Sequence, residues 1–335
     1  MKKVKQGIVM MMVMSMVLLL AACGGDETSG NESGKTYSFK LAHITPTNHM
    51  WHQAAEKFAE ELESKSDGRM KVEIYPASQL GTEADMVQQI EAGSVDFGLI
   101  TAAYMSSRSP SFAAWFMPYA FEDINAAHEA RTSDISKKIL ATLDEQGLIG
   151  LDYLFAGQRV MLFKDKEVTS PEDMAGLKLR VTPSPPMQDF YRSAGASPEG
   201  LPLPEVYAAV QTGVIDGMDM DLDAAITNKY YEVVKYGAVT NHMVWPSVAI
   251  VNKSTFEGMS EADQKIVRDA LTVATDFAVN TRSGQEEEFR QTLSDNGMKI
   301  YDIPADAFAD QIAEFDAKYK DSDPLIKEFI DTYRK

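Results

Sequence analysis

The most distinctive polar residue of this sequence is an arginine near the end of a short predicted strand. Residues 176–183 read Gly-Leu-Lys-Leu-Arg-Val-Thr-Pro, and this alternation predicts a strand that buries its leucines and Val181. Arg180 falls on the opposite face. A guanidinium offers five donors in a planar fork and keeps its charge when buried, so in a cleft it suits a ligand carboxylate. The alternative is a surface arginine paired with one of the many acids of the chain.

Three aspartates follow a second predicted strand, at residues 214–218, and alternate with apolar residues: Asp219, Asp221 and Asp223. Acids on one face repel one another unless they are solvated, hydrogen-bonded or opposed by cations. The spacing resembles the opening of an EF-hand loop, but Ala224 and Tyr230 stand where that loop needs glycine and glutamate, so calcium binding of that kind is excluded. Near Arg180, an aspartate of this row would accept hydrogen bonds from ligand hydroxyls or pair with an ammonium group.

Histidines cluster at His43, His49 and His52, and the last two have the i, i+3 spacing that can present two zinc ligands on one helix face. No fourth ligand is evident, so we predict that these histidines form hydrogen bonds. The sequence also contains no Gly-x-x-x-x-Gly-Lys-Ser/Thr loop, no Gly-x-Ser-x-Gly elbow and no His-Glu-x-x-His pair. These absences argue against ATP hydrolysis, serine esterase activity and zincin chemistry, and we expect no enzyme activity, no metal and no cofactor.

The beginning of the chain is typical of an export signal. Residues 1–5 are basic, and residues 8–20 form an apolar run, interrupted by one serine, that is too short to span a membrane. Leu-Ala-Ala-Cys at 20–23 closely resembles a bacterial lipobox and holds the only cysteine. The pattern predicts a signal peptide at 1–22, lipidation of Cys23 and a flexible polar tether at 23–35.

The net charge narrows the choice of partners. The formal charge is −18, and removal of residues 1–22 takes away three lysines and no acid, which leaves −21. Such an acidic protein is a poor partner for nucleic acid, so a site for anions must gather its few cations locally. A lipid-anchored protein with a polar tether suits a Gram-positive cell surface, although the same lipobox would serve in a periplasm.

The mature chain predicts an α/β fold. Roughly 300 residues exceed one ordinary core and favour two domains. Strand patterns at 37–43, 70–75 and 95–100 alternate with helix patterns at 50–64 and 82–92. This order is typical of a largely parallel sheet whose strand ends form a ligand crevice.

A short internal sequence similarity indicates that the chain has two related halves. Residues 90–96 and 210–216 each place an apolar residue three positions before a glycine and an aspartate three positions after it. Chance similarity between helix-to-strand turns is the alternative. Two α/β lobes that face each other across a ligand cleft would explain this internal similarity.

The last third of the chain is largely helical in pattern. Helical spacing begins at Ser260 and continues to about Asn296, so we expect a long helix that spans both lobes unless Ser283 and Gly284 break it. Two further amphipathic segments, at 305–319 and 324–333, are expected to pack as helices.

The chain contains a series of short motifs whose order resembles that in the substrate-binding proteins of tripartite ATP-independent periplasmic (TRAP) transporters, of the DctP type. The matching segments span nearly the whole mature chain: His43-Ile-Thr-Pro46, Phe58-Ala-Glu-Glu-Leu62, Gly68-Arg-Met-Lys-Val-Glu-Ile-Tyr-Pro76, Gln79-Leu-Gly81, Gly93-Ser-Val-Asp96, Phe116-Met-Pro-Tyr119, Gly157-Gln-Arg159, residues 170–181, Glu205-Val-Tyr207 and Asp216-Gly217. Several of these motifs are weak singly, but their common order argues against chance.

The resemblance implies a type II-like periplasmic-binding-protein fold that closes on a small organic acid. It also implies delivery of that acid to small and large membrane subunits driven by an ion gradient, and we expect the receptor itself to be a monomer. The expected lobes are residues 36–157 plus 245–283 for lobe I and residues 158–244 plus 284–335 for lobe II.

The same resemblance implies that Arg180 clamps the ligand carboxylate and that Arg159 lies near it as a second donor. We predict that the remaining contacts come from the loop after the first strand, from a later strand end, from the second lobe and from the hinge: His43, Asn48, Trp51, Thr101, Asp219 and Trp245.

One departure from the family pattern bears on the ligand. Sialic-acid and C4-dicarboxylate members often read Asp-Gly-Gln-Glu-Asn-Pro, whereas residues 216–221 read Asp-Gly-Met-Asp-Met-Asp. Met220 therefore replaces the amide donor, which puts those two ligands in doubt, while Asp219 keeps the acid. Met218 and Met220 make the predicted pocket wall more apolar and adaptable. The sequence leaves open sugar acids, hydroxy or keto acids, dicarboxylates and zwitterions.

Two other functions stay open at this point. A solute receptor for another transport or sensing system would have the same sequence features, and neighbouring genes for two membrane subunits would separate it from a TRAP receptor. A metal-dependent enzyme on the same fold would use the histidine cluster or the aspartate row, and metal analysis would reveal it.

Overall fold

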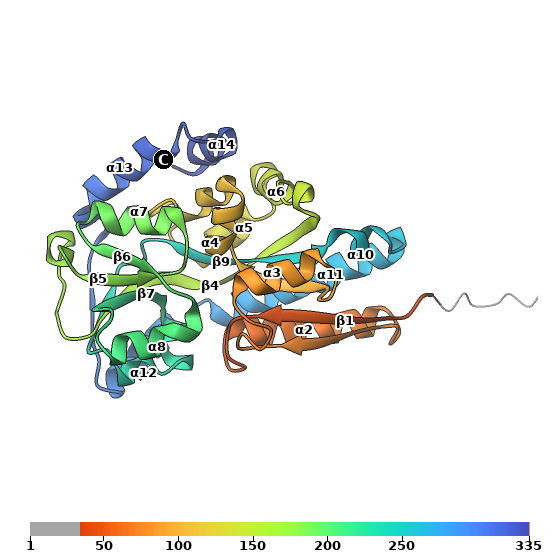
Figure 1. The fold of residues 1–335 in the computed structure, drawn as a ribbon, viewed down its shortest axis with the longest axis horizontal. Coiled ribbons are helices and arrows are strands. Elements are labelled where there is room, and N and C mark those ends of the chain that lie inside the picture. The colour runs from red at the N-terminus through yellow and green to blue at the C-terminus, as the bar shows by residue number, and fades with distance from the viewer. Residues whose placement is uncertain (1–33, 335) are drawn as a thin grey trace, which may run out of the picture. The chain divides into compact units, whose positions relative to one another are not determined.

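Strand β4 (Leu148–Phe163) is the element that joins the two halves of the sheet. Its first part pairs antiparallel with β9 (Val244–Asn252), and from Arg159 onward it pairs antiparallel with β7 (Gly217–Asp221). The register shifts between Phe155 and Gln158, just before the change of partner. In Figure 1, β4 and β9 run between the group that contains β1 and α2 and the group that contains β5 to β7.

The computed structural model describes residues 34–334, so the predicted signal peptide at 1–22, Cys23 and most of the tether at 23–35 lie outside the described residues. By their mutual contacts, residues 37–335 form one compact unit. Within the described range, ten strands join in one sheet of order β2-β1-β3-β9-β4-β7-β5-β6, and β8 pairs with β4 and β10. The remaining strands are β1 (Tyr37–His43), β2 (Met70–Tyr75), β3 (Phe97–Thr101), β5 (Lys178–Val181), β6 (Ser197–Gly200), β8 (Tyr236–Val239) and β10 (Lys299–Asp302).

Helices flank this sheet on both sides. The α-helices are α2 (Met50–Lys65), α3 (Glu83–Glu91), α4 (Ala102–Arg108), α5 (Ile124–Ala130), α6 (Asp134–Ala141), α7 (Pro185–Ser193), α8 (Leu203–Gln211), α9 (Leu222–Thr227), α10 (Lys253–Glu257), α11 (Glu261–Arg282), α12 (Glu286–Asp295), α13 (Ala309–Tyr319) and α14 (Pro324–Tyr333). Short 3₁₀ helices are η1 (Pro110–Phe116), η2 (Asp144–Gln146), η3 (Pro171–Met174), η4 (Tyr230–Glu232) and η5 (Ala305–Phe308). No helix among the described residues is both long and apolar enough to cross a membrane.

The internally similar segments, residues 90–96 and 210–216, have the same local structure in both halves. β1 and β3 are parallel neighbours in one half, and β5 and β7 are parallel neighbours in the other. Asp96 accepts a hydrogen bond from the Lys40 backbone N–H at 2.8 Å, and Asp216 accepts one from the Lys178 backbone N–H at 2.8 Å. Each aspartate therefore ties the start of one strand to its parallel neighbour. The mixed α/β fold predicted from the sequence is confirmed.

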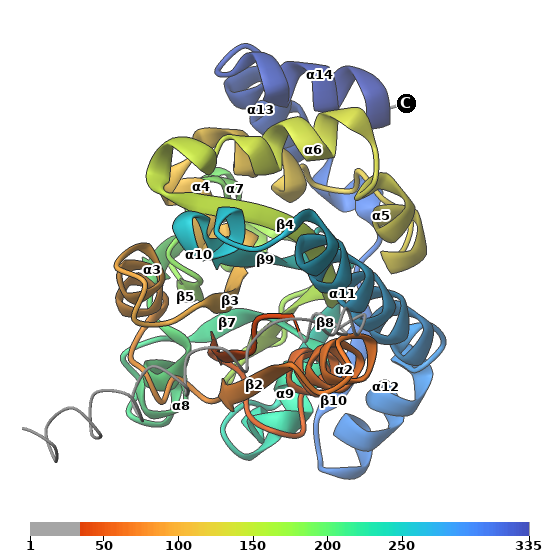
Figure 2. The same cartoon turned by 90° about the vertical axis from the view of Figure 1, so that its right-hand side faces the viewer.

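The helical segment expected at 260–296 is divided in two. Ser260 caps α11 by accepting a hydrogen bond from the Asp263 backbone N–H at 3.1 Å. The chain leaves the helix after Arg282, and Gly284 has φ of +86°, a conformation that favours glycine. α11 lies along α2 (Figure 2) and also packs on β4, whereas α12 packs against α9 and β10. The single helix expected to span both lobes is thus two helices.

The position of the aspartate row also differs from the prediction. The strand expected at 214–218 is β7 at Gly217–Asp221, and all five of its residues are buried. Asp219 and Asp221 therefore lie within the strand, and Asp223 lies in the first turn of α9. Likewise, Arg180 is as buried as Leu179 and Val181, because β5 is covered on both faces. Burial of a charged side chain in such a strand costs free energy unless hydrogen bonds or opposite charges compensate for the lost water.

Candidate functional site

Arg159 lies at the point where β4 changes partner, directly opposite Asp221 of β7. Its guanidinium is 1% exposed and pairs with both neighbouring acids. Nε and Nη2 contact Asp219 Oδ1, and Nη1 donates to Asp221 Oδ2 at 3.2 Å. Two carboxylates thus compensate the charge of one buried guanidinium. Because the compensation is mutual, Asp219 and Asp221 can lie in a buried strand.

Two tryptophans cover the other side of Arg159. The guanidinium carbon lies 3.9 Å from the ring centroid of Trp245, in cation–π geometry. Trp51 stacks on Trp245, with ring centroids 6.3 Å apart and an interplanar angle of 12°. The predicted residues Arg159, Asp219, Trp51 and Trp245 therefore come together, and Met220 is buried in the same strand as Asp219.

Asp219 is held by further donors. Tyr191 donates to its Oδ2 at 2.7 Å, and His242 Nε2 lies 3.0 Å from the same oxygen. Burial disfavours the charged form, but the Arg159 guanidinium and the His242 contact outweigh it and hold the pKa of Asp219 below its ordinary value. Asp219 is an anion enclosed by protein donors.

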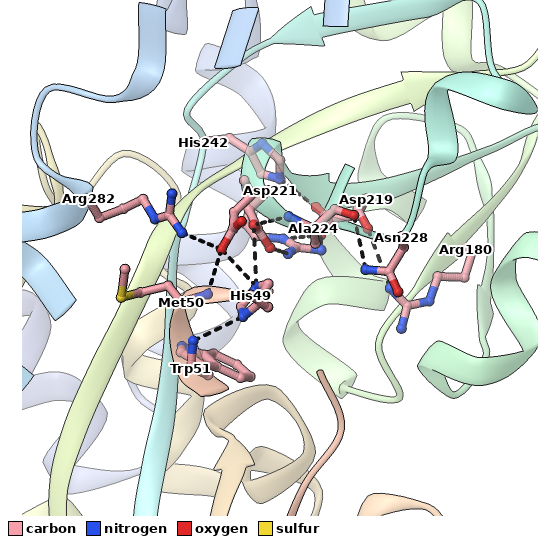
Figure 3. Close-up of polar contacts among 12 residues, drawn as sticks. His49, Met50, Trp51, Arg180, Asp219, Asp221, Ala224, Asn228, His242 and Arg282 are labelled. Atoms are coloured by element: carbon pink, nitrogen blue, oxygen red, sulfur yellow. Dashed lines mark hydrogen bonds and ion pairs between the residues drawn. The ribbon is translucent and has the colours of Figure 1, made fainter. Parts of the chain in front are cut away.

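Asp223 extends the charged network toward α2 and α11, and its partners Met50 and Arg282 are labelled in Figure 3. Its Oδ2 accepts hydrogen bonds from the Met50 backbone N–H at 3.0 Å and from Arg282 Nη2 at 2.6 Å. His49 Nε2 lies 3.4 Å from Asp223 Oδ2 and 3.9 Å from Asp221 Oδ1. The N-terminus of α2 and the C-terminus of α11 are thereby joined to α9.

His49, Asp221 and Asp223 bring three potential metal ligands close together. The oxygens that face His49 are already engaged: Asp221 Oδ1 accepts from the Ala224 backbone N–H at 2.8 Å, and Asp223 Oδ2 holds Arg282. With the guanidinium groups of Arg159 and Arg282 also bound to these acids, the cluster does not fit a cation site.

Arg180 differs from the other buried arginines of this region. Its Nε donates to the Leu201 carbonyl at 2.9 Å, and its Nη1 lies 3.5 Å from the Asp219 carbonyl. Among residues 34–334, no carboxylate oxygen lies within 4.0 Å of its nitrogens, whereas Arg159 and Arg282 are both paired. Burial lowers the pKa of Arg180 to about 10, so it remains a cation at neutral pH.

A cavity of about 180 Å³ opens beside Arg180. Its lining comes from the loops after β1 and β2, the start of α3, α4, the end of β5 with the residues after it, and the start of α8: Ile44, Ser78, Thr82, Glu83, Ala84, Tyr104, Arg180, Thr182, Pro183, Pro202, Leu203 and Pro204. Arg180 is the only cation of this lining and Glu83 the only acid. A second cavity, of about 270 Å³, has Arg282 as its one cation, which is already paired with Asp223, and two further acids, Asp123 and Glu286. We therefore place the candidate site at Arg180.

Glu83 is a site residue that the sequence analysis missed. Its carboxyl accepts hydrogen bonds from the Thr101 backbone N–H at 2.6 Å and from the Thr101 hydroxyl at 3.0 Å. Burial raises the pKa of Glu83 to about 7, with those hydrogen bonds and Arg180 opposing the rise. A glutamate in the first turn of a helix usually signals only favourable helix-end electrostatics, so the sequence held no specific sign of this role.

Ser78 was also missed. Its Oγ is buried and has no hydrogen-bond partner within the described part of the chain. Ala77 and Ser78 both have left-handed backbone angles, with φ of 51° and 57°. Such strain in non-glycine residues is often found at ligand sites.

Other predicted site residues lie elsewhere. His43 is fully buried: Nε2 contacts His52 Nδ1 at 3.0 Å and Nδ1 contacts the Thr45 hydroxyl at 3.0 Å. Burial and the neighbouring His52 lower the pKa of His43 to about 3, so it is neutral. Asn48 is exposed, and the Thr101 hydroxyl already donates to Glu83. Of the predicted contact residues, Arg180 alone lines the 180 Å³ cavity.

Comparison with known proteins shows the family of this chain. Residues 41–323 match the family described as bacterial extracellular solute-binding protein, family 7, or DctP. A solute-binding protein of Roseobacter denitrificans is 29% identical over 315 residues, which cover 94% of this chain and 96% of the relative. The C4-dicarboxylate-binding periplasmic protein DctP of Rhodobacter capsulatus is 29% identical over 262 residues, or 77% of this chain and 78% of the relative.

A solved structure resembles the fold over most of its length. The TRAP periplasmic solute-binding protein of Anaerococcus prevotii, solved with bound D-glucuronate, is 28% identical with a TM-score of 0.83, covering 89% of this chain and 99% of that one. The mixed α/β fold of this chain thus matches that of two-lobed TRAP periplasmic solute-binding proteins. The chain belongs to family 7 of the bacterial extracellular solute-binding proteins, whose members are substrate-binding receptors and not enzymes.

The buried Glu83 predicts a specific dependence of stability on pH. Because its folded pKa is raised from 4.5 to about 7, its neutral form favours folding, and this advantage is complete below pH 4.5 and lost as pH rises through 7. Relative to Glu83→Gln, the wild type should lose roughly 3 kcal/mol between pH 4.5 and 8. Urea unfolding across this range measures the difference. The exposed Glu145→Gln is the control, and an equal pH dependence for both variants would contradict the prediction.

Removal of Asp223 should destabilise the junction between α9, α2 and α11. Asp223→Ala leaves Arg282 buried without its acid and the Met50 N–H without its acceptor, a loss of about 3–5 kcal/mol. Asp165→Ala removes an exposed partner of Lys235 and should have little effect on stability, because solvent screens that pair. Denaturant midpoints compare the two, and an equal effect would show that the Asp223 contacts do not stabilise the fold.

Proposed function

We propose that this chain is the extracytoplasmic receptor of a TRAP-type secondary transporter and that it captures a small organic acid at Arg180. The observation that carries the proposal is a buried guanidinium that lines a cavity and has no carboxylate within 4.0 Å among residues 34–334. A buried cation without a counter-ion is costly, and a ligand carboxylate would remove that cost.

The relatives support an acid with hydroxyl groups. The Anaerococcus prevotii protein was solved with D-glucuronate and the Roseobacter denitrificans protein with L-galactonate. In the proposed complex the carboxylate binds Arg180, while Arg159, predicted from the sequence as a second donor, stays paired with Asp219 and Asp221. Asp219 holds Arg159 in place and Thr101 orients Glu83. The other contacts predicted from the sequence, His43, Asn48, Trp51, Trp245 and Met220, fall outside the 180 Å³ cavity.

The cellular arrangement is part of the same proposal. Cys23 would carry the lipid that anchors the receptor at the outer face of the cell membrane, with a Gram-positive surface favoured by the polar tether. Lobe I (36–157 plus 245–283) and lobe II (158–244 plus 284–335) would close on the acid, and the closed monomer would deliver it to the small and large membrane subunits.

Substitution of Arg180 tests the proposed clamp. A thermal-shift screen of sugar acids and hydroxy acids, which includes D-glucuronate and L-galactonate, first identifies an acid that stabilises the protein. Arg180→Ala should then weaken binding of that acid by about 10- to 150-fold, the equivalent of one charged hydrogen bond worth about 1.5–3 kcal/mol. Isothermal titration calorimetry measures the affinity.

The matched control is Arg192→Ala, which removes an exposed arginine of α7 that pairs with Asp189. It should bind the acid as the wild type does. Arg180→Lys should recover only part of the affinity, because an ammonium cannot form the two-pronged contact. Unchanged binding by a folded Arg180→Ala protein would refute the clamp.

A further inference from the structure

The charges around the candidate cavity restrict how many carboxylates a ligand can carry. Its lining offers one cation, Arg180, and one acid, Glu83. The other polar side chains are hydroxyls, on Ser78, Thr82, Tyr104 and Thr182, and the rest are apolar. A single carboxylate therefore finds one partner here, and a second carboxylate finds none.

The neighbouring arginines cannot serve as that partner. Arg159 is committed to Asp219 and Asp221, and Arg282 is committed to Asp223. These two arginines face three aspartates, so the region behind the cavity carries no spare positive charge. In Figure 3, Arg180 lies apart from the cluster of His49, Asp221 and Arg282. A second anion would have to be desolvated without compensation.

Glu83 adds to the discrimination between ligands with one carboxylate and ligands with two. Its carboxyl lines the same cavity as Arg180, and burial raises its pKa to about 7. A ligand with one negative charge offsets Arg180 and allows Glu83 to take up a proton and donate to a ligand hydroxyl. A ligand with two negative charges places its second charge in a cavity with an acid and no further cation.

The cavity also favours hydroxyl groups. The buried Ser78 Oγ has no partner within residues 34–334, so a ligand hydroxyl would complete its hydrogen bonding. The volume of about 180 Å³ greatly exceeds the roughly 10–15 Å³ that one water requires, which leaves room for a polyhydroxylated carbon chain.

We propose that this site selects polyhydroxylated monocarboxylates, such as aldonates and uronates, and rejects the dicarboxylates of the same carbon skeleton. The inference rests on the proposed function, because it takes Arg180 as the carboxylate clamp. It deepens that function by assigning the charge selectivity to the pairing of Arg159 with Asp219 and Asp221. The selectivity would separate this chain from relatives named for C4-dicarboxylates.

The test compares acids that differ by one carboxylate. Calorimetric titration uses D-glucuronate against D-glucarate and D-galacturonate against galactarate, with succinate as a short dicarboxylate and D-glucose as the uncharged sugar. At pH 7.5, at least one uronate should bind 100-fold or more tightly than its dicarboxylate, and D-glucose should bind weakly because it lacks the anion.

Two variants test the cause of the selectivity. Asp221→Asn removes one acid from Arg159 and should reduce the ratio of uronate to dicarboxylate affinity at least fivefold. Glu83→Gln should reduce the ratio at pH 8, where Glu83 is ionised, and have less effect at pH 6. If Asp221→Asn does not fold, Glu83→Gln alone decides this point, and Glu145→Gln, on the surface, should leave the ratio unchanged.

The outcomes separate this inference from the proposed function. Equal or tighter binding of a dicarboxylate, lost on Arg180→Ala, would overturn the charge selectivity and leave the clamp standing. Uronate binding that survives Arg180→Ala, or no binding of any acid in the series, would overturn both. A ratio unaffected by either variant would overturn the assigned cause.

Discussion

The rest of this structure depends on the placement of one buried arginine between two buried acids. Arg159 of β4 holds Asp219 and Asp221 of β7 at the point where β4 leaves β9. The pairing allows a strand with two carboxylates to occupy the interior, and it fixes β7 beside β4 in register. Trp245 closes the cluster from the β9 side, so three strands meet around one charge.

That pairing gives Arg180 its significance. Both arginines are almost completely buried, and they belong to neighbouring regions of the same half of the sheet. One is neutralised by the protein and the other is left for a ligand. A receptor of this design keeps its binding charge desolvated and oriented before the ligand arrives, which lowers the cost of organising the site on binding.

Local patterns in the sequence were sufficient for much of the fold. Strands at 37–43 and 70–75 and the helix at 324–333 have the predicted bounds, because period-two and helical alternation act within a few residues. The buried charges could not be predicted this way. Arg159 and Asp219 are 60 positions apart, and Asp223 and Arg282 are 59 apart. Without those partners in view, the aspartates of β7 resemble a solvated loop, and Glu83 resembles an ordinary helix-end acid.

A crystal structure of the protein with D-glucuronate, or with the acid that stabilises it most in the thermal-shift screen, would show which arginine binds the ligand carboxylate. We expect carboxylate oxygens within hydrogen-bond distance of the Arg180 guanidinium, with Arg159 still paired to Asp219 and Asp221. A carboxylate bound in two-pronged fashion to Arg159, with its aspartates displaced and Arg180 unoccupied, would contradict it.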